Sequence, residues 1–430
     1  MFHIGINALK QRLPAMLLYA SSTGSLIIGL GAQSVSFIVL ARFLGTDQYG
    51  YLATISAVTN LGVPWCGLGA GEVMRRLVGR DPGLYPMILG HCLILLCVTG
   101  IVLISIVTTG LAVFVRAVSD PVANFIVMLL LVSCNMVLYT WIVFVEQIFL
   151  AHSEFKRANI VNAGFGIARA LTVLVACLGF GVDDLLAWAA WNAAVYVGAS
   201  LACVAAIWSY GSPRWRLIRG ELTLGMTISG SGFIWALRQN MDLLALSSVD
   251  PPGLIGAYGV ARRVMSTASV IGASFDRLIY PKLAVVGKDG PSATLHLARK
   301  YVLYAIAITV PTSLALFAVA PVLPSVFGRD FGEAILILRA LCWTLILLVA
   351  QNVAFDALNA ADRHHSRFVV GTVTGLLGTG LVVGLTYAYG IIGTFVGTYL
   401  SEGAMTLALW MTLKVLSDRQ RRETHARTIT

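Results

Sequence analysis

The sequence predicts an all-α polytopic membrane protein, with about twelve transmembrane helices in two pseudo-symmetric six-helix lobes. The first observation behind this prediction is the composition. Of the 430 residues, 58% are hydrophobic without counting glycine and only 12% are charged. Soluble domains are about 45–50% apolar with glycine included and about 25% charged. A chain with so little polar surface cannot cover a water-soluble globule, which excludes a soluble enzyme.

The second observation is a series of long segments without charged residues. Neither Pro86–Val115 nor Tyr301–Gly328 contains Asp, Glu, Lys or Arg, and Phe368–Leu413 contains only Glu402. The last segment is too long for one helix across a ~30 Å hydrocarbon core, so it predicts a hairpin broken near Gly390. Membrane β-strands would instead be alternating segments of about 10 residues. The predicted spans are 18–40, 49–70, 86–111, 122–149, 158–180, 185–209, 224–247, 255–280, 300–327, 332–358, 368–388 and 391–414.

Lysine and arginine are concentrated on one side of the predicted membrane, which carries both termini and the even-numbered loops. The opposite side carries only Arg42, Arg116 and Arg329. Because cytoplasmic loops are rich in Lys and Arg, we expect a multi-pass protein of the bacterial cytoplasmic (inner) membrane with both termini in the cytoplasm. This asymmetry also explains the formal net charge of +10 without a nucleic-acid partner.

The third observation is an internal repeat. Similar short segments recur at equivalent loops of the two halves, always 209 residues apart (258 − 49 = 209). Tyr49-Gly50 recurs as Tyr258-Gly259, Phe149–Val161 as Leu358–Val370, and Phe180-Gly181 as Tyr389-Gly390. The repeat predicts an N-terminal lobe over residues 1–215. It predicts a C-terminal lobe over residues 216–430, ending in a short basic cytoplasmic tail. Two six-helix halves of the same orientation are an architecture of transporters.

Several arginines fall inside the predicted spans, and we select five of them as candidates for substrate binding: Arg238, Arg262, Arg263, Arg169 and Arg339. A charged side chain at mid-bilayer costs at least ~2.5–3.5 kcal/mol, so each must face a wet interior or pair with another charge. The functional interpretation is a cationic patch in a central cavity that holds an anionic substrate, since the planar guanidinium suits phosphate. The alternative is structural pairing, or snorkelling to the interface.

Three acids within the spans complete the candidate set, as coupling-ion sites or ion-pair partners: Asp242, Glu146 and Glu402. Arg238 and Asp242 are four residues apart, which predicts a local ion pair on one helix face. Arg262 and Arg263 are adjacent and point about 100° apart on a helix. We therefore expect one of them to face the cavity and the other a neighbour or headgroups. The Asp276-Arg277 pair lies near a helix end, where snorkelling suffices.

No catalytic motif is present. The sequence has no G-x-x-x-x-G-K-[ST] loop, no G-x-S-x-G elbow and no H-E-x-x-H pair, so we expect no enzyme activity and no cofactor. The seven cysteines lie in apolar stretches without a C-x-x-C spacing, which predicts neither a disulfide framework nor a metal site.

Four segments carry a resemblance to a known family: Phe43-Leu-Gly-Thr-Asp-Gln-Tyr-Gly50, Asp242-Leu-Leu, Gly256-Ala-Tyr-Gly-Val-Ala-Arg262 and Tyr280-Pro-Lys282. With the twelve-helix pattern, the chain resembles the polysaccharide-transporter branch of the multidrug/oligosaccharidyl-lipid/polysaccharide (MOP) exporter superfamily, the Wzx-type flippases with a MATE/MOP-like fold. The resemblance implies alternating access between two bundles. It also implies flipping of a polyprenyl-pyrophosphate-linked oligosaccharide to the outer leaflet for exopolysaccharide biosynthesis. The implied partners are the lipid bilayer, this glycan substrate, and polysaccharide polymerase and export machinery.

Two other function classes compete. A cation-coupled multidrug or small-solute antiporter of the same superfamily should present acids and aromatic residues to a cationic drug, whereas basic residues dominate the interior of this chain. A membrane scaffold without transport would leave the duplication and the intramembrane charges unexplained.

Overall fold

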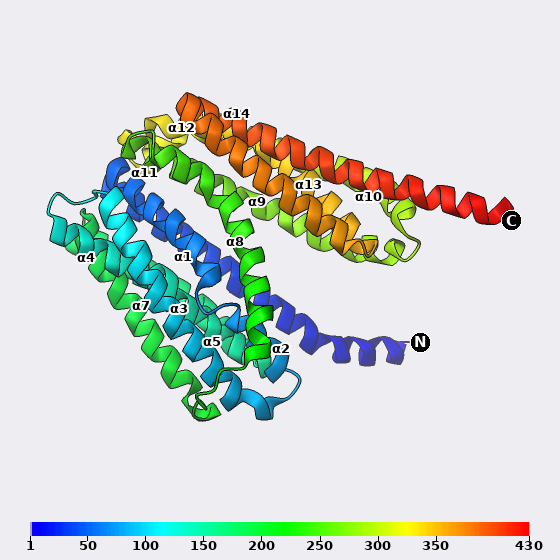
Figure 1. Cartoon of the computed structure of the whole chain (residues 1–430), viewed down its shortest axis with the longest axis horizontal. Helices are drawn as coiled ribbons and strands as arrows, with labels where there is room; N and C mark the ends of the chain where they lie inside the picture. Colours follow the sequence, from blue (N-terminus) through cyan, green and yellow to red (C-terminus); the bar gives the residue numbers. More distant parts are fainter. Residues whose placement is uncertain (1, 430) are drawn as a thin grey trace. The chain divides into compact units, whose positions relative to one another are not determined.

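In the computed structural model the backbone is described over residues 2–429, and the side chains over the same range except for 2–28, 30, 271, 273, 274, 277, 424 and 426–429. Lys10, Arg12 and Arg427, which count among the basic residues of the predicted cytoplasmic side, and Arg277 of the Asp276-Arg277 pair lie outside the described side chains. Every regular element in residues 2–429 is a helix (Figure 1). The all-α prediction is therefore confirmed.

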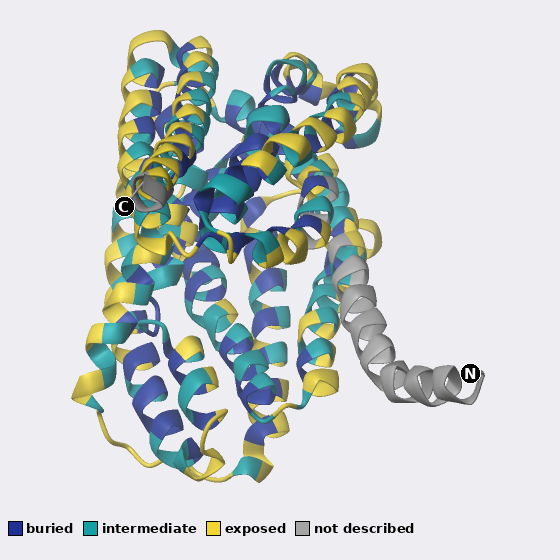
Figure 2. Cartoon of the chain, turned by 90° about the vertical axis from the view of Figure 1, so that its right-hand side faces the viewer, coloured by how far each residue is buried: buried dark blue, intermediate teal, exposed yellow. Residues whose placement is uncertain are grey.

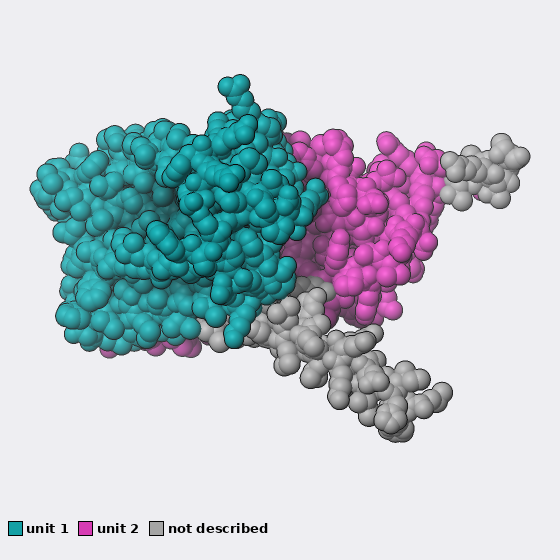
Figure 3. Space-filling view, turned by 90° about the horizontal axis from the view of Figure 1, so that it is seen from below, with its two compact units in different colours: residues 1–233 teal, residues 234–430 magenta. Residues whose placement is uncertain are grey.

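The chain divides into two compact units, residues 1–233 (unit 1) and 234–430 (unit 2), which Figure 3 colours separately. The sequence analysis places its lobe boundary earlier, between residues 215 and 216. The structural division falls inside helix α8 (Arg219–Ser247) because the first half of α8 packs closely on unit 1. A Cβ atom at Gly225 would lie 2.3 Å from the carbonyl oxygen of Leu68, and Ile218 N–H donates to Nδ1 of His91 at 3.1 Å.

Unit 1 contains the helices before α8. They are α1 (Phe2–Gly62), η1 (Val63–Trp65), α2 (Ala70–Val78), η2 (Pro82–Leu84), α3 (Tyr85–Phe114), α4 (Pro121–Val132), η3 (Ser133–Leu138), α5 (Tyr139–Ala151), α6 (Phe155–Leu174), η4 (Val175–Gly179), α7 (Leu185–Ile207) and η5 (Trp208–Tyr210).

Local sequence signals explain where several of these helices begin and bend. The Asp120 side chain accepts from the N–H of Ala123 at the start of α4, where Pro121 is the first helical residue. Asp184 caps α7 in the same way through the N–H of Ala187. Asp at the N-cap satisfies an amide that has no partner within the helix. Helix α1 bends at Gly45, whose φ of 71° favours glycine.

Among the described residues of unit 1, two apolar clusters form the interior. In one, Met74 and Ile88 pack with Ile148, which joins α2 and α3 to α5. In the other, Met128 packs with Trp188, which joins α4 to α7. Burial of these side chains holds the helices of unit 1 together and leaves the α1–α5–α6 region for polar groups.

Unit 2 contains the second half of α8 and the helices after it. They are α9 (Pro252–Gly287), α10 (Pro291–Val319), η6 (Ala320–Val322), α11 (Leu323–Phe327), η7 (Arg329–Gly332), α12 (Glu333–Leu341), α13 (Thr344–Ala360) and α14 (His364–Ile429). Leu283, Leu358 and Leu409 lie in an apolar cluster that joins α9, α13 and α14.

Helix α14 is a hairpin of two helices, as the sequence predicts. It breaks at Gly390, where φ is 57° and ψ is −139°. The two arms approach closely, since Cβ atoms at Gly393 and Gly397 would lie 1.8 Å from the Leu385 carbonyl oxygen and 2.8 Å from the Val382 Cα atom. Only glycine allows these distances.

Exposed residues lie along the helices of both units (Figure 2), and many of them are large and apolar. On α3, for example, Val98, Ile101, Val102 and Ile106 are 50–66% exposed. An apolar surface of this kind is stable in lipid rather than in water. Six segments of the described chain are long and apolar enough to cross a membrane: Pro82–Phe114, Pro121–Ala151, Phe155–Gly179, Leu185–Tyr210, Pro291–Phe327 and His364–Glu423.

A seventh span results if the pair Arg329–Leu341 and Thr344–Ala360, bent by 45°, is counted as one. The chain is therefore a multi-pass membrane protein, while the predicted number of twelve spans stays a prediction. Helix α8 is not among these apolar segments. It carries the charged residues Arg238 and Asp242, which lower its mean hydropathy.

Candidate functional site

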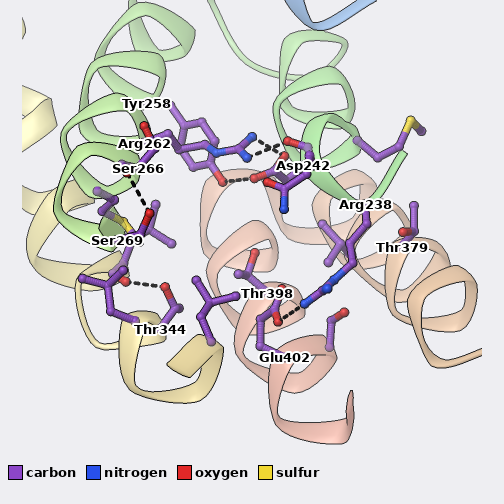
Figure 4. Close-up of a pocket in the computed structure, with 18 residues that line it drawn as sticks. Arg238, Asp242, Tyr258, Arg262, Ser266, Ser269, Thr344, Thr379, Thr398 and Glu402 are labelled. Atoms are coloured by element: carbon purple, nitrogen blue, oxygen red, sulfur yellow. Dashed lines mark hydrogen bonds and ion pairs between the residues drawn. The ribbon is translucent and has the colours of Figure 1, made fainter. Parts of the chain in front are cut away.

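Unit 2 encloses a polar cavity of about 210 Å³ among α8, α9, α12, α13 and α14. This is far above the roughly 10–15 Å³ that one water molecule requires. Charged, amide and hydroxyl side chains gather around it (Figure 4). The cavity is therefore a wet or ligand-filled space within an otherwise apolar bundle.

The first charged group at this cavity is Arg238 on α8. Its guanidinium forms an ion pair with the Glu402 carboxylate of α14, and it donates to Oε1 of Gln351 at 2.7 Å. Gln351, on α13, in turn donates to the backbone carbonyl of Glu402 at 3.0 Å. The two charged side chains are only 18% and 14% exposed, so each depends on the other for compensation.

The second charged group is Arg262 on α9, paired with Asp242 on α8. Arg262 Nη1 lies 2.6 Å from Asp242 Oδ1, and its Nη2 donates to the Gln239 carbonyl at 2.6 Å. The hydroxyl of Tyr258, which is fully buried, donates to Asp242 Oδ2 at 2.7 Å. Both oxygens of the Asp242 carboxylate are thus occupied.

The predicted local pair between Arg238 and Asp242 is wrong. Each residue pairs across helices instead, Arg238 with Glu402 and Asp242 with Arg262 (Figure 4). Residues four apart on a helix are neighbours, but a second helix at each of these positions brings a partner with opposite charge closer. The two ion pairs leave these four groups with no net charge.

Arg262 and Arg263 separate as their spacing predicts. Arg262 lines the cavity, whereas Arg263 is half-buried and is not among the lining residues. The fifth candidate, Arg339 on α12, lies with its guanidinium carbon 4.8 Å from the centroid of the Phe317 ring. Its Nε donates to the Phe317 carbonyl at 3.3 Å. Arg339 therefore packs on α10, away from the lining of this cavity.

Unit 1 encloses a second polar cavity, of about 180 Å³, among α1, α5 and α6. Arg169 on α6 lies in its wall. The guanidinium carbon of Arg169 is 5.5 Å from the ring centroid of Tyr196 and 5.9 Å from that of Phe165. Its Nε is buried without a hydrogen-bond partner, and no described carboxylate lies within ion-pair distance of Arg169. The aromatic rings hold the guanidinium plane in place without neutralising it.

Glu146 on α5 lines the same cavity as Arg169. Its carboxylate accepts from Nδ2 of Asn162 at 3.2 Å. Glu146 and Arg169 are thus an acid and a base that share one cavity without a direct bond. Such a pair can bind an anion at the arginine while the acid exchanges a proton or a cation.

Sequence reasoning missed several residues that the folded chain brings to these cavities. Tyr258 and Gln351 were not selected, nor were the hydroxyl residues that line the unit 2 cavity: Ser266, Ser269, Thr344, Thr379, Thr398 and Ser401. One signal was available, because Tyr258, Arg262, Ser266 and Ser269 form a polar stripe at helical spacing on α9. Gln351 lies in an apolar helix and has no comparable signal. Among the described side chains, no group of three or more His, Cys, Asp or Glu residues could hold a metal ion.

Comparison with protein families gives one match. The sequence model of a family described as "Polysaccharide biosynthesis protein" matches residues 39–336, which is more than half of the chain. No curated protein sequence matches the chain.

Comparison with solved structures shows the fold. An inward-facing multidrug resistance MATE family transporter of the MOP superfamily is similar, with a TM-score of 0.69 and 14% identity, over 92% of this chain and 99% of that one. The lipid II flippase MurJ in an inward closed conformation has a TM-score of 0.71 and 13% identity, over 93% and 87%. A MOP superfamily transporter from Pyrococcus furiosus, whose binding pocket is described as having reverse polarity, has a TM-score of 0.57 and 14% identity, over 93% and 97%.

Proposed function

Because this chain belongs to the polysaccharide-transporter branch of the MOP exporter superfamily, we propose that it flips a polyprenyl-pyrophosphate-linked oligosaccharide. In this proposal it works in the bacterial cytoplasmic membrane and delivers the lipid-linked glycan to the outer leaflet for cell-surface polysaccharide biosynthesis. Both termini lie in the cytoplasm, as the distribution of Lys and Arg requires.

The observation that carries the proposal is Arg169. It is a cation in the wall of a membrane-embedded cavity, held on the faces of Tyr196 and Phe165, with no described carboxylate to neutralise it. Keeping such a charge in a membrane protein costs ~2.5–3.5 kcal/mol on insertion scales. An anionic substrate offsets this cost. A phosphate group accepts two parallel hydrogen bonds from the edge of the guanidinium, which stacking on aromatic rings leaves accessible.

The transport step follows from the position of the charges. We assign the pyrophosphate to the unit 1 cavity, where Arg169 donates to it, while the prenyl chain stays in the lipid. The two units then alternate access, as expected for two repeated bundles. Glu146 is the acid that shares the cavity with Arg169, so we assign the coupling of a proton or cation to Glu146. Asp242 and Glu402 serve as ion-pair partners of Arg262 and Arg238.

The alternative, a cation-coupled multidrug or small-solute antiporter, is less well supported. A cationic drug requires a free carboxylate, and both carboxylates at the unit 2 cavity are paired with arginine. The carboxylate at the unit 1 cavity, Glu146, shares that cavity with the Arg169 cation, which would repel a cationic drug. Drug resistance conferred on a sensitive host, without any change in surface polysaccharide, would favour the antiporter.

The experiment is to delete the gene in its host and to follow lipid-linked intermediates during complementation. We expect wild-type protein to restore polymer export and Arg169→Gln to leave intermediates on the inner leaflet at a wild-type protein level. Arg339→Gln is the matched control, since Arg339 also stacks on an aromatic ring but lines neither cavity. Normal export with Arg169→Gln would reject the role of Arg169, and no build-up after deletion would reject the flippase.

A further inference from the structure

The cavity of unit 2 differs from that of unit 1 in its charge. Arg238 donates to Glu402 and Gln351. Arg262 donates to Asp242 and to the carbonyl of Gln239. Nη2 of Arg238 and both terminal nitrogens of Arg262 are thus engaged inside the protein, and the two carboxylates cancel the charge of the two arginines. A pyrophosphate would therefore bring negative charge that no arginine is left to neutralise, unless it displaced a carboxylate from its arginine and so left that carboxylate buried without a partner.

Four of the hydroxyl groups that line this cavity donate to backbone carbonyls. Ser266 and Ser269 on α9 donate to the carbonyls of Arg263 and Ser266 at 2.8 and 2.7 Å. Thr344 on α13 donates to Leu341 at 2.7 Å, and Thr379 on α14 donates to Gly375 at 2.8 Å. Each hydroxyl has one proton and two lone pairs. Because each of these four protons is donated to a backbone carbonyl, the four hydroxyls offer acceptor lone pairs toward the cavity.

One further polar atom lines the cavity without a partner. Oγ1 of Thr398 on α14 is buried and makes no hydrogen bond within the protein. A buried hydroxyl without a partner costs ~1–3 kcal/mol, so this position favours a ligand that supplies a hydrogen bond.

These observations indicate which ligand charge the unit 2 cavity accommodates. An anion finds hydroxyl acceptors and two arginines whose positive charge Glu402 and Asp242 already neutralise. A cation finds two guanidinium groups and no carboxylate free to receive it. An uncharged molecule that carries many donors, such as the hydroxyl and amide N–H groups of a sugar, matches the lining.

We propose that the unit 2 cavity is a subsite for an uncharged sugar residue of the transported glycan, bound through its hydroxyl and amide donors. This inference rests on the proposed flippase function and names what the unit 2 cavity binds. The ligand is a neutral sugar, held among Ser269, Thr344 and Thr398.

The test compares two lipids on purified full-length protein in lipid nanodiscs. One is undecaprenyl pyrophosphate without sugar, and the other is the lipid-linked oligosaccharide extracted from the deletion strain. The variant Ser269→Ala/Thr344→Val/Thr398→Val removes three hydroxyls with little change of shape. The control, Thr312→Val, removes a hydroxyl that also donates to its own helix, to Ile308 at 3.0 Å, but does not line the cavity.

We expect the triple variant to weaken binding of the glycan-bearing lipid by at least about tenfold, with binding of the sugar-free lipid unchanged. Arg169→Gln should weaken both, and Thr312→Val neither. Equal weakening of both lipids by the triple variant would place the pyrophosphate in unit 2 and overturn the proposal, as would no weakening of either. If wild-type protein binds neither lipid, the flippase function fails and this subsite fails with it.

Discussion

The cavities of the two units contain the same kinds of charged residue but differ in how those residues are paired. In unit 2, each arginine at the cavity forms an ion pair, Arg238 with Glu402 and Arg262 with Asp242. In unit 1, Arg169 lies over two aromatic rings, and no described carboxylate is within ion-pair distance of it. An intramembrane arginine is therefore not by itself evidence of a cationic binding site. The neighbouring helices decide whether its charge is available to a ligand.

The internal repeat makes the difference more specific. Arg238 and Asp242 lie 209 residues after Gly29 and Gln33, and all four line the cavity of their own unit. Arg169 in turn corresponds at the same offset to a glycine, Gly378. The cavity arginine of the C-terminal half, Arg238, thus lies on the first helix of that half, α8. The cavity arginine of the N-terminal half, Arg169, lies on α6, which is the fifth predicted span of its half. Only the first-helix position has an acid one turn away.

The largest effect should come from breaking a pair in unit 2. Glu402→Ala leaves Arg238 nearly buried without its carboxylate, which should lower the free energy of unfolding by about 3–5 kcal/mol. Steric trapping in lipid bicelles measures this quantity. The double variant Arg238→Ala/Glu402→Ala should recover part of the loss, because no unpaired charge remains.

The control for this pair is a surface pair of unit 1. Glu72 lies 2.7 Å from Arg75, and these side chains are 44% and 52% exposed. Glu72→Ala should therefore cost less than about 1 kcal/mol. Equal losses for Glu402→Ala and Glu72→Ala would show that the unit 2 pair is effectively solvated, and the contrast between the cavities would be lost.

An intermediate effect is expected at Tyr258. Tyr258→Phe removes a buried hydroxyl that donates to the Asp242 carboxylate at 2.7 Å, and hydrogen bonds to charged groups contribute about 1.5–3 kcal/mol. The same unfolding measurement applies. Tyr387→Phe is the matched control, since Tyr387 is 60% exposed and bonds to Ser248 at 2.9 Å. A loss no larger than that of the control would mean that Asp242 does not need Tyr258.

The smallest effect, about tenfold in affinity or about 1.4 kcal/mol, should come from making unit 1 resemble unit 2. Gln33→Glu places a carboxylate in the cavity of Arg169, at the position that corresponds to Asp242. The new acid should pair with Arg169 and weaken binding of undecaprenyl pyrophosphate in nanodiscs. Binding that is unchanged or tighter would show that the charge of Arg169 is not what holds the lipid pyrophosphate.

Several features of this protein could be predicted from the sequence. The all-helical, multi-pass character and the hairpin at Gly390 were predicted and are confirmed. These features depend on local chain properties, namely apolar runs long enough for a bilayer and a glycine that permits positive φ. The membership of the polysaccharide-transporter branch was also recognised, from short motifs. The twelve spans and the lobe boundary at residue 215 stay predictions.

The sequence alone determined which segments enter lipid, because the bilayer solvates each segment by its own composition, and it supplied the charged residues inside those segments. The tertiary structure alone decided which of those charges are free. Arg238 meets Gln351 and Glu402, which are 113 and 164 residues away along the chain, while Arg169 meets two aromatic rings and no described acid. Electrostatic compensation acts over a few ångströms in space, and no spacing in the sequence fixes which helices come that close.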